Sequence, residues 1–353
     1  MAKVNDPVTI NGITLKNRLT VAPTVKFDYA GEDGKVTEKH IAHYAERANG
    51  GYGLICVEAT AVTPEGRFGK NHLGLWEDAQ IEGHRKIAKV CHEAGTAVIL
   101  QINHTGITGN PEFGPAKGPS AVPTRDGGMS VEMSPDEIRN MQQAYIDAAK
   151  RAGDAGYDGI QLHGCHGYLI NQFVSPKTNL RTDEYGKDRS LFASGIIRGI
   201  RQACGKDFLI SIRTPGIEPD IENAVAVAKK YVEAGCDYLQ VSHGIEGVKV
   251  VPQDEPFSDL CSLGINFRKA YDWKVPVSAV GGLLTPETVR YVIENDLIDT
   301  VDLARAALAD PGFAKAVLEG KPYVKCFECK ACQYGPFTNH ICPAALQRKR
   351  AKQ

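Results

Sequence analysis

The chain has 353 residues, with 41 Lys and Arg against 42 Asp and Glu, and 10 Cys. A balanced charge with one short basic run, QRKRAK, argues against a nucleic-acid partner, and no run of about 18 apolar residues predicts a membrane span. The N-terminus MAKVNDPVTI lacks a signal-peptide layout, so we expect a cytoplasmic protein with a small-molecule ligand and reduced or metal-bound cysteines.

Short apolar, β-branched segments alternate with longer helical patterns along the chain. The segments predicted to be strands are, in chain order, 18–23, 52–59, 97–103, 159–163, 207–213, 237–242, 275–280 and 299–304. Nearly continuous hydrophobicity is typical of parallel strands that are buried on both faces. Amphipathic segments at 78–94, 134–155 and 221–234 predict helices, and each ends in a glycine suited to a C-terminal cap.

The segment MSPDEIRNM contains a strong helix start, with Ser134 as the cap, Pro135 at the first helical position and Glu137 three residues after the cap. Eight strand–helix units in a chain of this length predict an α/β fold, a single (β/α)8 TIM barrel over residues 1–320. An open doubly wound sheet is the alternative. Residues 321–353 are expected to form a short cysteine-rich extension.

Polar residues that follow the predicted strands are the candidates for function, because a TIM barrel carries its chemistry on the loops at the carboxyl ends of its strands. Gly281 and Gly282 follow the seventh strand and Arg305 follows the eighth, where this fold often binds phosphate. They predict a phosphorylated cofactor or substrate, with a plain tight turn as the alternative. Arg213 offers a permanent positive charge to an electron-rich ring, and Gln101 offers both a donor and an acceptor to its edge. For each of them, an ordinary hydrogen bond across the barrel mouth is the alternative.

The stretch GYDGIQLHGCHGYLINQF, residues 156–173, ends a predicted strand with His163, His166 and Tyr168 close together. Both imidazoles could donate to one ligand oxygen and stabilise an enolate, while Tyr168 delivers a proton to carbon. The His-x-x-His spacing also occurs in metal sites, but no carboxylate follows at a matching interval. A structural pair of histidines remains the other alternative.

The phrases LKNRLTVAP, VEATAVTPEGR, HGCHGYLINQFVSPKTNLRTDEYG and ALADPGFAKA resemble the old yellow enzyme family of FMN-dependent ene-reductases, over residues 5–320. The resemblance implies FMN across the barrel mouth and NADH or NADPH as the hydride donor. It also implies an oxidoreductase that reduces the C=C bond of an α,β-unsaturated carbonyl compound, an enone or an enoate.

The resemblance also assigns roles by position. His163 and His166 would hold the substrate carbonyl oxygen, and Tyr168 would be the proton donor. The implied flavin contacts are Pro23, Thr24, Val25, Ala59, Gln101, Arg213, Gly281, Gly282, Ala304 and Arg305. The family usually has threonine or cysteine where Val25 stands, and valine cannot make the hydrogen bond by which that side chain tunes the flavin. Lys26 suggests a partly cationic substrate pocket, suited to a carboxylate or phosphate group.

The last thirty residues hold four cysteines in the pattern Cys-x2-Cys-x2-Cys-x9-Cys-Pro, formed by Cys326, Cys329, Cys332 and Cys342. This spacing is closer to that of iron–sulfur proteins than to the two separated Cys-x2-Cys pairs of structural zinc. Zinc and free thiols remain alternatives, because four cysteines specify a metal better than they specify which metal.

The tail also resembles that of the larger relatives 2,4-dienoyl-CoA reductase and trimethylamine dehydrogenase, which implies a [4Fe-4S] cluster. Those relatives commonly have three residues between the second and third cysteines and a longer final gap. Because the sequence contains no second Gly-x-Gly-x-x-Gly module, electrons would come from nicotinamide or from a separate ferredoxin or electron-transfer flavoprotein. The candidates for the face that docks such a donor are Lys321, Lys325 and Lys330, with the basic end at Arg348, Lys349 and Arg350. A plain solvated tail is the alternative.

Two further readings come from the same residues. An amine-oxidising flavoprotein like trimethylamine dehydrogenase would need an aromatic cage for a cation, but the chain has only 2 Trp, and neither Trp76 nor Trp273 falls at the predicted mouth. A non-catalytic metal-binding barrel is disfavoured by the intact set of histidines, tyrosine and arginine. The sequence leaves the oligomeric state open, a homo-oligomer included.

Overall fold

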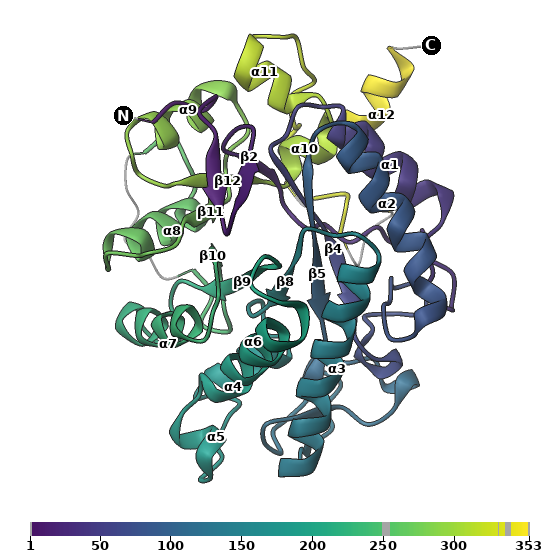
Figure 1. Cartoon of the computed structure of the whole chain (residues 1–353), viewed down its shortest axis with the longest axis vertical. Helices are drawn as coiled ribbons and strands as arrows, with labels where there is room; N and C mark the ends of the chain where they lie inside the picture. The colour runs from purple at the N-terminus through teal and green to yellow at the C-terminus, as the bar shows by residue number, and fades with distance from the viewer. Residues whose placement is uncertain (1, 249–254, 331, 336–339, 352–353) are drawn as a thin grey trace.

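The computed structural model describes residues 2–248, 255–330, 332–335 and 340–351, and these contain one closed barrel of eight parallel strands (Figure 1). In order around the barrel, the strands are β3 (Leu19–Val21), β4 (Leu54–Ala61), β5 (Ala97–Asn103), β8 (Gly159–His163), β9 (Leu209–Pro215), β10 (Tyr238–Ser242), β11 (Val277–Val280) and β12 (Thr300–Leu303). All eight predicted strands are confirmed, with ends that differ by no more than two residues. The single TIM barrel is therefore the fold of this chain.

Helices surround the barrel (Figure 1). The longer ones are α1 (Glu38–Ala48), α2 (Ile81–Glu93), α3 (Pro135–Asp154), α6 (Leu191–Cys204), α7 (Ile221–Glu233), α8 (Asp259–Lys269) and α9 (Pro286–Glu294). The shorter ones are α4 (Leu169–Val174), α5 (Glu184–Lys187), α10 (Arg305–Ala309), α11 (Phe313–Glu319) and α12 (Pro343–Arg350). The predicted start of α3 is confirmed, because the Ser134 hydroxyl accepts from Glu137 N and the Glu137 carboxylate accepts from Ser134 N.

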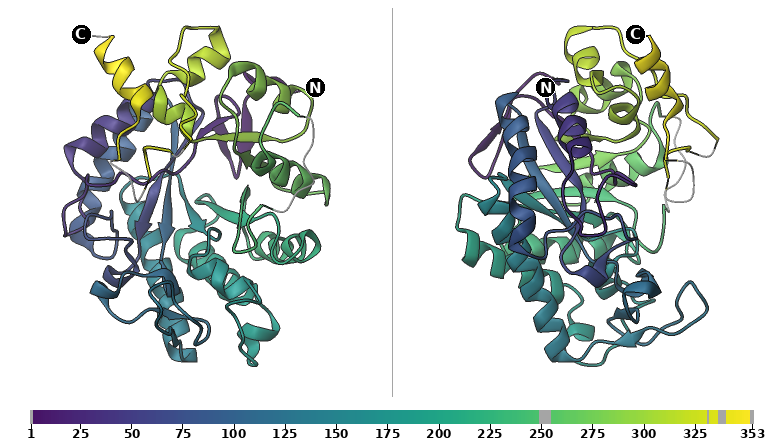
Figure 2. Two further views of the ribbon diagram at one scale, coloured as in Figure 1. Left: turned by 180° about the vertical axis from the view of Figure 1, so that it is seen from behind. Right: turned by 90° about the vertical axis from the view of Figure 1, so that its right-hand side faces the viewer.

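The amino end of the barrel is closed by a hairpin that sequence analysis missed. Strands β1 (Val8–Ile10) and β2 (Ile13–Leu15) pair with each other, and Ile10 and Leu15 pack against apolar residues at the start of the barrel strands. In the right-hand view of Figure 2 this hairpin lies on one side of the barrel, and the C-terminal tail lies on the other. A ligand in the barrel must therefore enter from the side that carries the tail.

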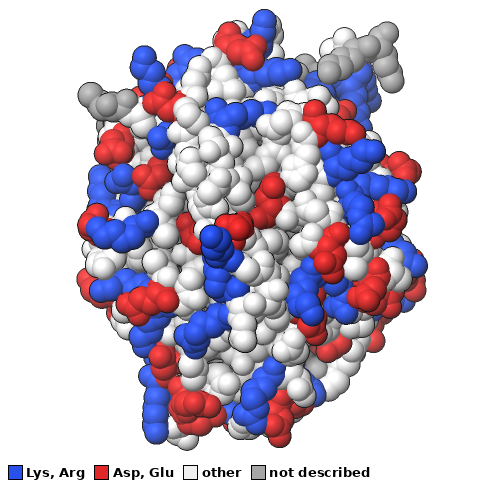
Figure 3. Space-filling model, viewed as in Figure 1, with Lys and Arg blue, Asp and Glu red and all other residues white. Residues whose placement is uncertain are grey.

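Charged side chains of both signs are interspersed over the face that Figure 3 shows, its centre included. This mixture agrees with the near balance of acidic and basic residues in the chain. Among the described residues, no helix has the length and apolar character needed to cross a membrane.

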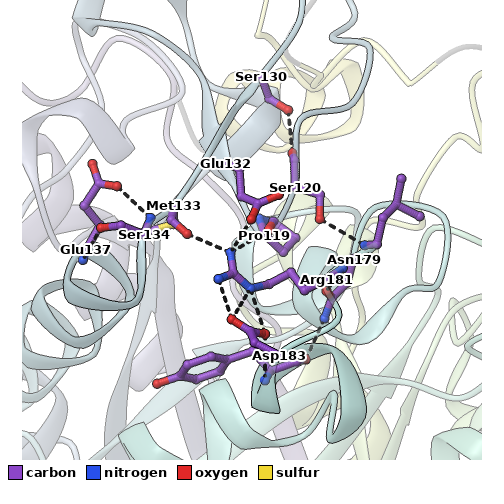
Figure 4. Close-up of polar contacts among 12 residues, drawn as sticks. Pro119, Ser120, Ser130, Glu132, Met133, Ser134, Glu137, Asn179, Arg181 and Asp183 are labelled. Carbon is purple, nitrogen blue, oxygen red and sulfur yellow. Dashed lines mark hydrogen bonds and ion pairs between the residues drawn. The ribbon is translucent and has the colours of Figure 1, made fainter.

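The long loop between β5 and α3 is fastened by one arginine from a neighbouring loop (Figure 4). This loop contains the short strands β6 (Lys117–Gly118) and β7 (Val131–Glu132). Arg181 Nη1 donates to Pro119 O at 3.0 Å and to Met133 O at 2.7 Å, so it holds both sides of the loop. Its Nε donates to Asp183 Oδ2 at 2.9 Å. Because the Arg181 side chain is only 5% exposed, these carbonyls depend on it for their hydrogen bonds.

Replacing Arg181 by methionine should lower the free energy of unfolding by about 3 kcal/mol, because two carbonyls and a carboxylate lose their donor. Urea unfolding measures this loss, and hydrogen exchange should show faster exchange over residues 117–133. Arg139→Met is the matched control, since Arg139 pairs with Asp136 on an exposed helix surface. Its cost should stay below about 0.5 kcal/mol. Equal losses in the two variants would contradict the role given to Arg181.

Candidate active site

The loop after β8 carries the three residues predicted to act on a substrate. His163 is the last residue of β8, and Tyr168 directly precedes α4. His166 lies between them with φ of 61°, in the left-handed region that few residues other than glycine adopt. Its backbone N–H donates to His243 O at 3.1 Å, which ties this turn to the loop after β10. The turn therefore brings all three side chains to the barrel mouth.

The two histidines are hydrogen-bonded to each other in this structure. His163 Nε2 lies 2.9 Å from His166 Nδ1, and His166 Nε2 lies 2.8 Å from Ser242 Oγ. If Ser242 donates its hydroxyl proton to His166, the proton of His166 points to His163 Nε2, and the proton of His163 is on Nδ1. Among the described residues, that Nδ1 is buried and has no partner. The pair then offers one free donor, from His163.

Burial keeps both imidazoles neutral. It lowers the pKa of His163 to about 3, and the nearby Arg213 charge adds to this effect. The pKa of His166 is lowered well below its ordinary value, again mainly by burial. At neutral pH the two rings therefore act as hydrogen-bonding groups and not as cations.

Tyr168 lies beside this pair. Its ring centroid is 4.8 Å from that of His163 and 4.9 Å from that of Phe68. Burial raises the pKa of the Tyr168 hydroxyl, so the group stays protonated at neutral pH. The residue remains half-buried, which leaves it within reach of a bound molecule. A protonated phenol at this position can serve as a proton donor.

A chain of polar side chains crosses the barrel just below the mouth. Gln101 Nε2 donates to Gln161 Oε1 at 2.6 Å, Gln161 donates to Gln240, and Gln240 Nε2 donates to Asp302 Oδ1 at 2.8 Å. Arg213 completes the chain, because its Nη1 donates to Asp302 Oδ2 at 3.2 Å. The two predicted ring contacts, Gln101 and Arg213, are thus fixed by one network of buried residues.

Gly281 and Gly282 form a narrow cradle after β11. Their φ angles are 114° and 68°, which side chains rarely adopt. A Cβ atom on Gly282 would lie 2.6 Å from the backbone nitrogen of Ser258. Ser258 Oγ is buried nearby and has no partner among the described residues. Arg305 is exposed and is the first residue of α10, two residues after the end of the neighbouring strand β12.

These features fit FMN. The buried Nε of Arg213 has no partner among the described residues, so it is available to a ring placed over the mouth. Gly281 and Gly282 pack so closely against Ser258 and Leu260 that neither position can hold a side chain, which leaves their backbone uncovered in the corner of the fold where phosphate binds. The sequence analysis missed Ser258, although its hydroxyl is an additional polar group at this corner.

The segment after β3 is held against the mouth by a buried carboxylate. Lys26 N donates to Glu58 Oε2 at 2.5 Å, and the Tyr44 hydroxyl donates to Glu58 Oε1 at 3.1 Å. Thr24 Oγ1 donates to Ala22 O at 3.3 Å within the same segment. Pro23 and Val25 are half-buried on either side of Thr24.

Two further implied flavin contacts, Ala59 and Ala304, lie on either side of this segment. Ala59 directly follows Glu58 in β4 and is 2% exposed, and its carbonyl oxygen lies 2.6 Å from His72 Nε2. Ala304 lines a small cavity together with Thr24 and Lys26. Ala59 is thus held by the hydrogen bond to His72, and Ala304 lies beside Lys26, whose backbone is bound to Glu58.

The expected cationic substrate pocket at Lys26 is wrong. The residue is only 2% exposed, and its Nζ lies 4.6 Å from the ring centroid of Tyr334 in the C-terminal tail. The tail covers the ammonium group. The sequence did not reveal this contact, because residues 26 and 334 are far apart along the chain. A substrate cannot reach Lys26 without displacing that tail.

The four tail cysteines line one cavity. The cavity is lined by Arg305, Leu308, Cys326, Phe327, Cys329, Cys332, Gln333, Tyr334, Cys342, Pro343 and Ala344. All four cysteines are free thiols in this structure. The four predicted ligands thus line the same cavity, and their binding of one group stays a prediction.

The sulfur spacing bears on the size of that group. Among the described residues, the only trio of His, Cys or carboxylate ligand atoms that lie within 4.8 Å of one another is His163, Cys165 and His166. No three tail sulfurs therefore approach each other so closely. A single zinc ion with tetrahedral thiolates needs sulfurs about 3.8 Å apart, since each Zn–S bond is about 2.3 Å. In the trio, burial raises the pKa of Cys165 to about 12, which disfavours a metal-binding thiolate.

Sequence analysis missed the residues that hold the site together. A polar residue inside an otherwise apolar strand, as in GIQLH, YLQVS and TVDL, was the available sign of the network of Gln161, Gln240 and Asp302. No sequence pattern linked Tyr334 to the segment after β3, because the two are joined only by the folding of the tail.

Comparison with known proteins identifies the family. A family model described as NADH:flavin oxidoreductase / NADH oxidase matches residues 3–323. The chain is 34% identical over 322 residues to an NADPH dehydrogenase of Bacillus licheniformis, an alignment that covers 89% of this chain and 93% of that protein.

Solved structures agree with this assignment. A 2-naphthoyl-CoA reductase in complex with 2-naphthoyl-CoA superposes with a TM-score of 0.86 at 28% identity, covering 94% of this chain but only 55% of that chain. The chain thus spans little more than half of that relative. An old yellow enzyme homologue from Zymomonas mobilis superposes with a TM-score of 0.78 at 26% identity, covering 92% of this chain and 95% of that one. The chain therefore belongs to the NADH:flavin oxidoreductase / NADH oxidase family, that of old yellow enzyme, whose members are NAD(P)H-using flavin oxidoreductases.

Proposed function

We propose that the protein is an FMN-dependent ene-reductase that adds a hydride and a proton across the C=C bond of an α,β-unsaturated carbonyl compound. The observation that carries this proposal is the group of His163, His166 and Tyr168 at the mouth, above the buried charge of Arg213. When bound, FMN supplies the hydride that it has received from NADH or NADPH. A thioester-activated alkene belongs to the same substrate class, and the similarity to 2-naphthoyl-CoA reductase supports it.

The protein residues would act on the other end of the conjugated system. The free N–H of His163 binds the carbonyl oxygen, with His166 and Ser242 orienting the ring. As the β-carbon receives the hydride, negative charge grows on this oxygen, and a fixed neutral donor in a buried site stabilises it. Tyr168 gives its proton to the α-carbon, which completes the saturated product.

We infer that FMN is held by the residues that the family resemblance assigns. Arg213 and Gln101 contact the ring, and the buried network below the mouth keeps them in place. The residues proposed for the phosphate end are Gly281, Gly282, Ala304 and Arg305, and those along the ring edge are Pro23, Thr24, Val25 and Ala59. The glycine cradle and the unpartnered Arg213 Nε support this assignment.

We further propose that the extension over residues 321–353 holds a [4Fe-4S] cluster on Cys326, Cys329, Cys332 and Cys342. The shared cavity supports this proposal, and the sulfur spacing is wider than one zinc ion requires. When bound, such a cluster carries single electrons.

Replacing Tyr168 by phenylalanine should leave flavin reduction by NAD(P)H intact, because the phenol takes no part in that step. Reoxidation of the flavin by an enone such as cyclohexenone should slow about 100-fold, the usual contribution of a positioned proton donor. Stopped-flow absorbance separates the two half-reactions. The control is Tyr231→Phe, which removes a buried hydroxyl on helix α7, outside the proposed site. An unchanged enone rate in Tyr168→Phe would remove Tyr168 from the mechanism.

Anaerobically purified protein should contain flavin and about four irons with acid-labile sulfide per chain. Cys332→Ser should lose the iron and the broad visible absorption while keeping flavin, since one of four thiolate ligands is missing. Cys204→Ser, at a half-buried cysteine on α6, should keep both. Visible spectra with iron and sulfide assays check these results. Zinc in place of iron would contradict the proposed cluster and would not affect the proposed ene-reductase activity.

The exposed lysines of the tail are proposed to dock an acidic one-electron carrier such as ferredoxin. Lys321 and Lys330 are exposed, whereas Lys325 pairs with Glu328 at 3.4 Å. Replacing Lys321 and Lys330 by glutamine should slow reduction by ferredoxin and weaken its dependence on salt, because rim charges act mainly on association rates. Stopped-flow reduction at several ionic strengths measures both effects. Rates and salt slopes equal to those of the wild type would exclude docking at these residues.

A further inference from the structure

Tyr334 stands between the cysteine cavity and the segment after β3. Its side chain lines the cavity with the four cysteines. The Tyr334 hydroxyl donates to Val25 O at 3.0 Å, and the Nζ of Lys26 lies 4.6 Å from the centroid of its ring. One aromatic ring thus separates a lysine ammonium from the site where the thiolates converge.

Lys26 is a buried cation whose placement the proposed reaction does not explain. It is 2% exposed, and the cavity that it lines shares Leu308 with the cysteine cavity. Burial and, after it, the nearby Arg47 charge lower the pKa of Lys26 to about 7, while the Glu58 carboxylate and the Cys342 thiol oppose this shift. The ammonium group therefore lies within electrostatic reach of a cysteine of the tail.

The negative charge of a metal centre on the four cysteines would explain why Lys26 is buried beside it. Four thiolates around a dication, whether Zn²⁺ or an oxidised [4Fe-4S] core, leave a net charge of about −2. Such a charge in a partly buried site is costly unless cations lie close to it. Arg305 lines the cavity from the solvent side, where water screens its charge. Lys26 lies on the protein side, where screening is weak.

We propose that Lys26 is the buried counter-cation of the cysteine centre, held in place by the ring of Tyr334. The inference rests on the proposed metal centre and assigns to it a residue far from the cysteines in sequence. Lys26 acts through charge and makes no bond to the metal, so it is a positioning residue and not a ligand.

The tail is seated by contacts that do not involve Lys26. The rings of Phe27 and His340 stack with centroids 4.4 Å apart, and His340 Nδ1 lies 3.0 Å from Asp28 Oδ2. Farther along, Arg348 Nη2 lies 3.3 Å from Glu46 Oε2. A variant of Lys26 should therefore leave the tail in place and change only its electrostatics.

Lys26→Met should make the reduction potential of the tail cluster more negative, because loss of a nearby cation disfavours an added electron. A tenfold change in the ratio of reduced to oxidised cluster corresponds to about 59 mV for one electron, and we expect a shift of at least that size. A redox titration followed by electron paramagnetic resonance measures the shift on the whole chain. If the centre is zinc, chelator competition should show about 10- to 100-fold weaker binding.

Lys330→Met is the matched control, because Lys330 lies between two of the cysteines in sequence but is exposed. Its potential should stay within a few millivolts of the wild type, since exposed charges are screened. If Lys26→Met does not fold, Lys26→Gln tests the same point, because it removes the positive charge, leaves Glu58 unchanged and keeps a polar side chain at this position. A wild-type potential or metal affinity in these folded variants overturns the role of Lys26. Absence of any metal from the wild type instead overturns the proposed metal centre.

Discussion

Closure of the parallel barrel fixes where chemistry can occur in this chain. Since every barrel strand pairs on both sides, no sheet edge is left, and the carboxyl ends of all strands meet at one rim. The hairpin β1–β2 seals the opposite end with Ile10 and Leu15. Polar side chains that point into the barrel near this rim then meet one another, so residues as distant in sequence as Gln101 and Asp302 belong to one network.

The rim is organised by polar groups that have been removed from water. A buried side-chain amide or carboxylate is costly unless its hydrogen bonds are made, so the row from Gln101 to Asp302 and Arg213 is held in one arrangement. The same argument applies to the histidines, which stay neutral because burial disfavours their charged forms. Groups fixed in this way need little reorganisation when a reaction places charge beside them.

The C-terminal tail packs against the barrel mouth. Its Tyr334 and His340 contact residues 25–28, the segment that the family resemblance places along the flavin. The cysteine cavity and the edge of the flavin site therefore share a wall of protein. Any charge held by the cysteines would act on the mouth through this wall, and Lys26 is buried within it.

The sequence alone determined the barrel and the identity of the residues at its mouth. Hydrophobic runs predicted all eight strands, because strand length and burial are local properties of the chain. The ends of these strands then placed His163, Arg213 and Gly281 at the rim. Only the tertiary structure decided how those residues pair. The bond between His163 and His166, the network below the mouth and the burial of Lys26 under Tyr334 depend on contacts between segments up to 309 residues apart. Such contacts arise when the strands close into a barrel and the C-terminal tail packs against the segment after β3, and no local sequence pattern encodes them.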